Sequence, residues 1–160
     1  MRALRGFTLI ELVVTVALIG LLTAIAAPLA ETVVQRGKEH ELKSALMTMR
    51  DAIDAYKDAA DSGRIAKGVG ESGYPANLQV LVDGVVDKQS AGGAKLYFLR
   101  RIPRDPFASV EPGVTAAQTW GLRSSDTPPG TTSGEGGKDV YDVRSLSPGK
   151  ALDGTPYQEW

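Results

Sequence analysis

The distribution of apolar residues divides the chain into two unlike parts. The residues from Leu12 to Ala30 carry no charge, while Arg2 and Arg5 precede this run and nearly all other charges follow it. A helix of 19 residues is about 28 Å long, close to the roughly 30 Å of a bilayer core. The pattern predicts a membrane-spanning helix with its N-terminus in the cytoplasm, because basic residues stay on that side.

A second apolar pattern continues the same helix. From Leu42 onward the apolar positions are spaced 4, 3, 4, 3 and 4 residues apart, which is typical of one face of an amphipathic helix. We therefore predict a single helix from Thr8 to Ala60, bent near Pro28 and closed by Ser62-Gly63. An alternative is a helix that ends at Ala27. The apolar positions after Glu31 are Val33, Val34, Leu42, Ala45, Leu46, Met49, Ile53, Tyr56 and Ala60.

The remaining residues predict a small domain packed on the second half of this helix. A short helix is expected at 78–82, an extended or turning segment at 95–107, and strands at 118–123 and 139–144. The segment 125–138 is rich in Gly, Pro, Ser and Thr, so we expect a mobile hairpin loop there. The fold class is α+β: a long N-terminal helix on a small antiparallel sheet.

Composition excludes several classes of function. The 160 residues have a net charge of −1, so no nucleic-acid partner is expected, and the absence of cysteine excludes a thiol nucleophile or a disulfide framework. The single histidine, His40, lies among charged residues of the predicted helix, where a solvated position is expected. Trp120 and Trp160 are interpreted as core or edge aromatics.

Glu11 decides between three interpretations of the N-terminus: a cleaved signal peptide, a plain signal anchor, and a prepilin. A carboxylate at the edge of an apolar helix is costly, and the first two gain nothing from it. Residues Gly6-Phe7-Thr8-Leu9-Ile10-Glu11 resemble the processing site of type IV pilins and type II secretion pseudopilins. The resemblance implies cleavage after Gly6 by prepilin peptidase and N-methylation of Phe7. A buried charge must be paired, so we expect Glu11 to neutralise the Phe7 amine of a neighbouring subunit.

This resemblance also implies an organisation. Residues 1–6 would be the leader, 7–30 the transmembrane and fibre-core helix, and 31–160 the periplasmic head. Pro28 stands where these families carry a proline at which the helix loosens in fibres. The chain would sit in the inner membrane as a single-pass protein and then join a periplasmic fibre.

The head is similar to that of the G-type major pseudopilin of type II secretion, on four segments: Tyr74-Pro75, Leu99 to Phe107, Asp142 to Ser147, and Trp160. The similarity implies a structural subunit that polymerises with itself and with minor pseudopilins, driven by a platform protein and an assembly ATPase, to push folded proteins across the outer membrane. Two alternatives stay open: a type IV pilin for adhesion, motility or DNA uptake, and a membrane-anchored enzyme or binding protein.

The same family binds calcium in the loop after its second strand. The resemblance implies a Ca²⁺ site here made by Asp142, Ser145, the Leu146 carbonyl, Ser147 and Asp153. The sequence departs from the family at Pro148-Gly149-Lys150, where an aspartate would be expected and a lysine brings a repelling charge. The alternative is an ordinary loop without metal. Arg100, Arg101 and Arg104 form a basic cluster, interpreted either as a solvated face or as a contact with acidic residues of another subunit.

Overall fold

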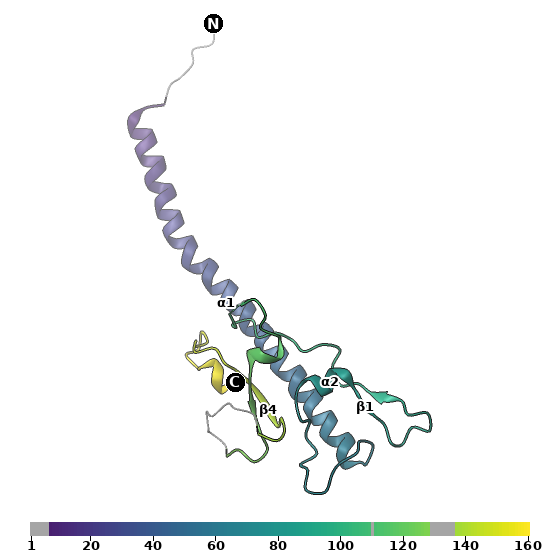
Figure 1. The fold of residues 1–160 in the computed structure, drawn as a ribbon. Helices are drawn as coiled ribbons and strands as arrows, with labels where there is room; N and C mark the ends of the chain where they lie inside the picture. Colours follow the sequence, from purple (N-terminus) through teal and green to yellow (C-terminus); the bar gives the residue numbers. More distant parts are fainter. Residues whose placement is uncertain (1–6, 110, 129–136) are drawn as a thin grey trace. The chain divides into compact units, whose positions relative to one another are not determined.

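The computed structural model describes residues 7–109, 111–128 and 137–160, with the backbone alone for residues 25–30. The chain divides into two compact units, Met1–Gly37 and Lys38–Trp160, which we treat separately. Helix α1, Leu9–Asp61, contributes residues to both (Figure 1). The boundary at residue 30 between the fibre-core helix and the head stays a prediction.

The long helix confirms the prediction to within one residue at each end. Pro28 lies inside it, so the alternative of a helix ending at Ala27 is wrong, while the bend at Pro28 stays a prediction. The C-terminal turn closes as expected: the Gly63 N–H donates to Ala60 O at 3.1 Å and the Arg64 N–H to Ala59 O at 2.9 Å. Gly63 has a φ of 73°, the left-handed conformation that commonly ends helices.

The helix residues of the second unit bury the predicted stripe from Leu42 onward. Leu42, Met49 and Ile53 are fully buried. Val33 and Val34, the apolar positions that precede the stripe, are more than half exposed. They precede the second unit and fall outside the regular spacing, so the amphipathic pattern applies only from Leu42.

The second unit contains one further α-helix and two antiparallel strand pairs among its described residues (Figure 1). Strands β1 and β2 pair with Val85 opposite Leu96, and β3 and β4 pair with Trp120 opposite Ser145. Two short 3₁₀ helices, Ala117–Thr119 and Tyr157–Glu159, flank the second pair. The elements are α2 (Gln79–Asp83), β1 (Val85–Val86), β2 (Lys95–Leu96), β3 (Trp120–Arg123) and β4 (Asp142–Ser145).

These elements confirm the α+β class and correct some details. The predicted helix at 78–82 is α2, and the strand at 118–123 is confirmed as β3 after one 3₁₀ turn. The strand predicted at 139–144 begins only at Asp142, because the Val140 N–H donates to Pro75 O instead of joining the ladder. The β1–β2 pair was not predicted, since two residues a strand give no periodicity. Most of the predicted hairpin loop, residues 129–136, lies outside the described residues.

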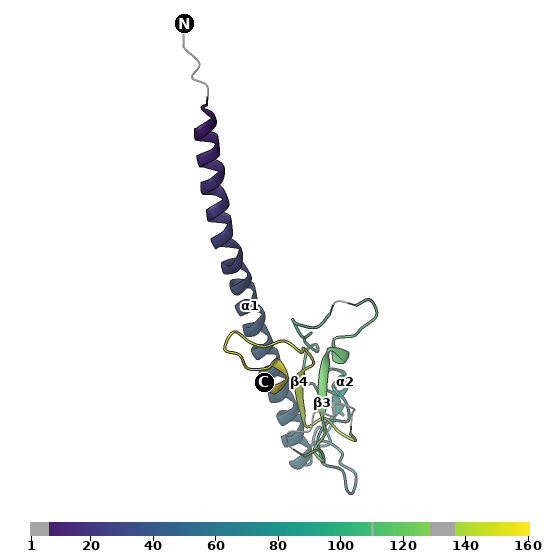
Figure 2. The same cartoon turned by 90° about the vertical axis from the view of Figure 1, so that its left-hand side faces the viewer.

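One hydrophobic core joins α1 to these elements. Leu42, Met49 and Ile53 of α1 pack in a cluster that includes Leu81 of α2 and Val143 of β4. Strands β3 and β4 lie side by side in Figure 2, as their register requires. The indole N–H of Trp120, which is 3% exposed, donates to Pro103 O at 2.8 Å, so this residue is the core aromatic that the sequence predicted.

A buried aspartate ties three segments of the second unit together. The Asp139 carboxylate accepts hydrogen bonds from the Ser124 hydroxyl at 2.6 Å, the Ser125 hydroxyl at 2.6 Å, the Ser125 N–H at 2.9 Å and the Ser72 hydroxyl. Burial alone would raise the pKa of Asp139, but these hydrogen bonds to the charged form outweigh it and lower the pKa to about 2.

We predict that Asp139→Asn lowers the free energy of unfolding by about 2 kcal/mol at neutral pH. The folded-state pKa lies below its ordinary value, so the carboxylate stabilises the fold above pH 4 or so and loses this effect as the pH falls through about 2. Urea unfolding of the purified chain in detergent micelles, followed by tryptophan fluorescence, measures the difference. A gap between the two proteins that stays constant from about pH 5 to about pH 2 would contradict the assignment.

Two methionines on α1 provide a matched test of the core. Met49 is 0% exposed and Met47 is 67% exposed. We predict that Met49→Ala lowers the free energy of unfolding by about 2–5 kcal/mol, because it leaves a cavity. Met47→Ala should change it by less than about 0.5 kcal/mol. Equal effects in urea unfolding would show that the helix face is assigned incorrectly.

Candidate functional site

The start of α1 is built by a capping interaction between Thr8 and Glu11. The Glu11 N–H donates to Thr8 Oγ1 at 3.3 Å, and the Leu12 N–H donates to Thr8 O at 3.2 Å. Thr8 is therefore the N-cap, and the Thr-x-x-Glu spacing is that of a capping box. Our sequence analysis missed this role, although the spacing itself was a signal that could have found it.

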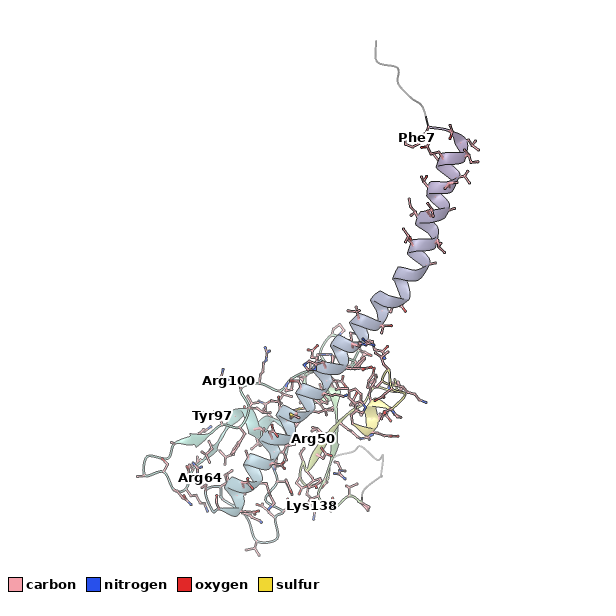
Figure 3. All side chains as sticks on the ribbon, turned by 180° about the vertical axis from the view of Figure 1, so that it is seen from behind. Phe7, Arg50, Arg64, Tyr97, Arg100 and Lys138 are labelled. Atoms are coloured by element: carbon pink, nitrogen blue, oxygen red, sulfur yellow. The ribbon has the colours of Figure 1, made fainter. Side chains whose placement is uncertain are left out.

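The Glu11 carboxylate makes no hydrogen bond or ion pair with any residue that the structure describes, and it is exposed. It lies in the first turn of α1, where the helix dipole favours a negative charge. Gly6, on the leader side of the predicted cleavage position, lies outside the described residues. Phe7, on the other side, is 81% exposed and lies at the start of α1 (Figure 3).

Apolar side chains surround α1 on every side in its first turns. All large hydrophobic residues from Phe7 to Leu22 are at least half exposed. Two threonine hydroxyls on this part of α1 bond to the helix itself: Thr15 Oγ1 donates to Leu12 O and Thr23 Oγ1 to Ile19 O, both at 2.9 Å. The Glu11 carboxylate is thus the only charged group between Phe7 and Ala24. The exposed large hydrophobic residues of this stretch are Phe7, Leu9, Ile10, Leu12, Val13, Val14, Val16, Leu18, Ile19, Leu21 and Leu22.

In the part of the chain that the structure describes, no helix is both long and apolar enough to cross a bilayer. The side chains of residues 25–30, the C-terminal part of the predicted span, are outside that part.

The residues predicted to bind calcium are engaged with the rest of the second unit. Asp142 Oδ1 accepts from Arg50 Nε at 2.8 Å, and Oδ2 accepts from Arg123 Nη2 at 3.2 Å. Ser145 is fully buried, and its hydroxyl donates to Asp105 Oδ2 at 2.6 Å. The Ser147 N–H donates to the Ser145 hydroxyl at 3.1 Å.

The remaining predicted ligands stabilise local turns. The Leu146 carbonyl accepts from Gln158 Nε2 at 3.4 Å, and Asp153 Oδ1 accepts from the Thr155 N–H at 2.9 Å. That backbone hydrogen bond is the main reason why the pKa of Asp153 is lowered. No group of three or more Asp, Glu, His or Cys side chains that could hold a metal occurs in the described residues.

This donor set does not fit calcium as it is arranged. Calcium takes six to eight oxygen ligands, whereas the carboxylate at the centre of the predicted set is paired with two guanidinium groups. Calcium binding stays a prediction that the geometry does not favour, and no step of the function proposed below depends on it.

The three arginines of the basic cluster differ in whether they have a hydrogen-bond partner among the described residues. Arg104 is turned into its own loop, where it donates to Val114 O at 3.1 Å and to Ser109 O at 2.9 Å. Arg100 and Arg101 are exposed and have no partner among the described residues. Only these two remain available for another molecule. His40 is exposed, as predicted.

Comparisons with known proteins agree with the N-terminal features. Residues 1–27 match the family described as the prokaryotic N-terminal methylation motif. The type II secretion system core protein G of Klebsiella pneumoniae is 28% identical over 113 residues, which cover 68% of this chain and 73% of that protein. The corresponding protein of Aeromonas hydrophila is 26% identical over 117 residues, covering 68% and 71%.

Pilins are similar over a shorter region. The type IV major alpha-pilin of Moraxella bovis is 38% identical over 55 residues, 34% of this chain and 35% of the pilin. No solved structure matches the chain significantly. The chain thus combines the N-terminal methylation motif with a type IV pilin-like α+β fold, and its resemblance to the G-type pseudopilins of type II secretion is confirmed.

Proposed function

We propose that this chain is a structural subunit of a type II secretion pseudopilus. Prepilin peptidase cuts after Gly6 and Phe7 is N-methylated, while the apolar first half of α1 holds the subunit in the inner membrane with its head in the periplasm. Subunits then leave the membrane and polymerise through these helices. The growing fibre helps to push folded proteins across the outer membrane, and the chain itself carries out no reaction.

The exposed apolar surface of α1 is the observation that carries this proposal. A helix that is apolar on all sides is normally buried, in a membrane or among other helices. Each large side chain contributes about 1.5–3 kcal/mol when it is fully buried, so leaving the stretch from Phe7 to Leu22 in water would be very unfavourable. Lipid covers this surface before assembly, and the helices of other copies cover it afterwards.

Glu11 supplies the specific contact between copies. Its carboxylate is unpaired within the described residues, and cleavage after Gly6 creates an amine on Phe7. Two unit charges 4 Å apart attract by about 4 kcal/mol at an effective dielectric constant of about 20. Pairing Glu11 of one copy with the amine of another therefore fixes the register of helices that are otherwise uniformly apolar.

The heads add a second contact of opposite charges. Arg100 and Arg101 are exposed on the head and have no partner among the described residues. Figure 3 shows the position of Arg100. Asp51, Asp54 and Asp58 are exposed on α1. We assign these two surfaces to neighbouring subunits. Minor pseudopilins, a platform protein and an assembly ATPase complete the machinery that the resemblance implies.

A type IV pilin is the second candidate, favoured by the similarity to the Moraxella pilin. That similarity reaches only 35% of the pilin, whereas the type II secretion proteins G are covered over 71–75% of their lengths. The absence of cysteine also argues against a pilin stapled by a disulfide. Both points favour the secretion pseudopilus.

We predict that Glu11→Gln lowers the yield of fibres by at least about tenfold, because it removes the charge that pairs with the amine. The cap is made by the main-chain N–H of residue 11 and Thr8 Oγ1, which the substitution leaves in place, so the start of α1 is preserved. Thr8→Ala is the matched control. It removes the N-cap, which lowers the stability of the helix by about 1 kcal/mol, and it keeps the Glu11 carboxylate. The measurement is the amount of sheared fibre from cells that contain the secretion machinery, compared with the amount of subunit in the membrane fraction.

The pattern across these variants separates pairing from capping. Glu11→Ala and Glu11→Lys should behave like Glu11→Gln, with normal amounts in the membrane. Wild-type fibre yield from all three would eliminate the pairing role, and a loss confined to Thr8→Ala would assign the defect to the cap. Mass spectrometry of the N-terminus gives an independent check: methylated Phe7 is expected, and a retained Met1 would overturn the proposed processing.

A further inference from the structure

Arg50 of α1 gathers three oxygen atoms from two distant segments. Its Nε donates to Asp142 Oδ1 at 2.8 Å, and its Nη2 donates to the main-chain oxygens of Val143 at 3.1 Å and Trp160 at 2.7 Å. Asp142 and Val143 belong to β4, while Trp160 lies beyond the last 3₁₀ turn. One side chain thus fixes the helix, a strand and the final residues of the head (Figure 3).

Glu39, which precedes Arg50 on α1, binds the same final segment through its carboxylate. Its Oε1 accepts from the Leu152 N–H at 2.9 Å and from the Tyr157 hydroxyl at 3.0 Å. Glu39 and Arg50 are 11 residues apart, about three helical turns, so both project from one side of α1. Glu39 thus contacts the segment 149–160 at Leu152 and Tyr157, and Arg50 contacts it at Trp160.

Main-chain hydrogen bonds and one buried aromatic ring shape the segment 149–160 from within. A short turn closes with the Ala151 N–H donating to Thr155 O and the Gly154 N–H to Ala151 O, both at 2.8 Å. Its buried anchor is Tyr157, whose ring stacks on Phe107 with centroids 4.1 Å apart. Glu39 binds the hydroxyl of the same tyrosine, so the ring is held at both its edge and its face.

We propose that Arg50 and Glu39 together fix the segment 149–160 without a metal ion, and that the Arg50 guanidinium takes the part that a bound cation would play at Asp142. A cation in such a loop neutralises a carboxylate and collects main-chain oxygens. Guanidinium is permanently charged and carries five directed N–H donors, so it does both. Here it neutralises Asp142 and binds the oxygens of Val143 and Trp160.

A second arginine, Arg123, also pairs with Asp142 and so opposes the binding of a metal ion there. Arg123 Nη2 lies 3.2 Å from Asp142 Oδ2, so both oxygens of the carboxylate face a guanidinium. A divalent ion at Asp142 would have to displace at least one of these two positive groups. The family resemblance implied a calcium site made by Asp142, Ser145, the Leu146 carbonyl, Ser147 and Asp153, but it gave no sign of the arginine that reaches Asp142 from α1.

Hydrogen–deuterium exchange of the full processed chain in detergent micelles tests the proposal. The variants are Arg50→Gln and Glu39→Gln, with Arg101→Gln as the matched control because Arg101 is exposed and has no partner among the described residues. Each is measured in excess calcium chloride and in excess EGTA. A hydrogen bond to a charged group is worth about 1.5–3 kcal/mol, so exchange in 149–160 should rise about tenfold or more in Arg50→Gln.

We expect the wild-type chain to show the same exchange in 149–160, and the same melting temperature, with calcium and with EGTA. Exchange in α2 should not change in either variant, which separates release of the segment from unfolding of the head. Slower exchange of 149–160 in calcium than in EGTA would overturn the proposal, and this result does not depend on any variant folding. Exchange in 149–160 that is the same in Arg50→Gln as in Arg101→Gln would overturn the proposal as well.

Discussion

An apolar helix surface that its own chain does not cover is the constraint on which the rest of this molecule depends. The side chains from Phe7 to Leu22 are exposed all around α1, so either lipid or other helices must cover them. Lipid tails are as apolar as leucine, which means that exchanging lipid for sister helices gains little hydrophobic free energy. In the assembly that we propose, packing and the charge on Glu11 therefore decide when a subunit leaves the membrane and which register it takes.

Two further features of α1 agree with close approach by other helices. Gly20 lies inside the helix, where glycine is less favourable than alanine by about 0.5–1 kcal/mol. A Cβ at this position would meet nothing within 4 Å in the single chain, so the fold of one subunit does not require the glycine. The Thr15 and Thr23 hydroxyls bond to main-chain oxygens and need no water. Both features suit a helix whose neighbours are apolar and near.

The sequence predicted what depends on local periodicity and failed where contacts between distant residues decide. The bounds of α1 and the buried stripe from Leu42 follow from helical spacing, and α2 and β3 were found for similar reasons. The late start of β4 was missed because Val140 bonds to Pro75, 65 positions earlier. The calcium prediction, which stays untested, could not take account of a contact of the same kind, since Arg50 meets Asp142 only in the folded chain.

The difference between an arginine and a metal ion at Asp142 affects what the head requires in order to fold. A metal site would make the order of 149–160 depend on the free calcium concentration around the head. Arg50 is part of the chain and is present at fixed stoichiometry, so its contacts form whenever α1 packs on β4. Because the guanidinium projects from α1, it also joins the end of the head directly to the helix. In the arrangement that we propose, a permanent connection between the head and α1 thus takes the place of control by a bound ion.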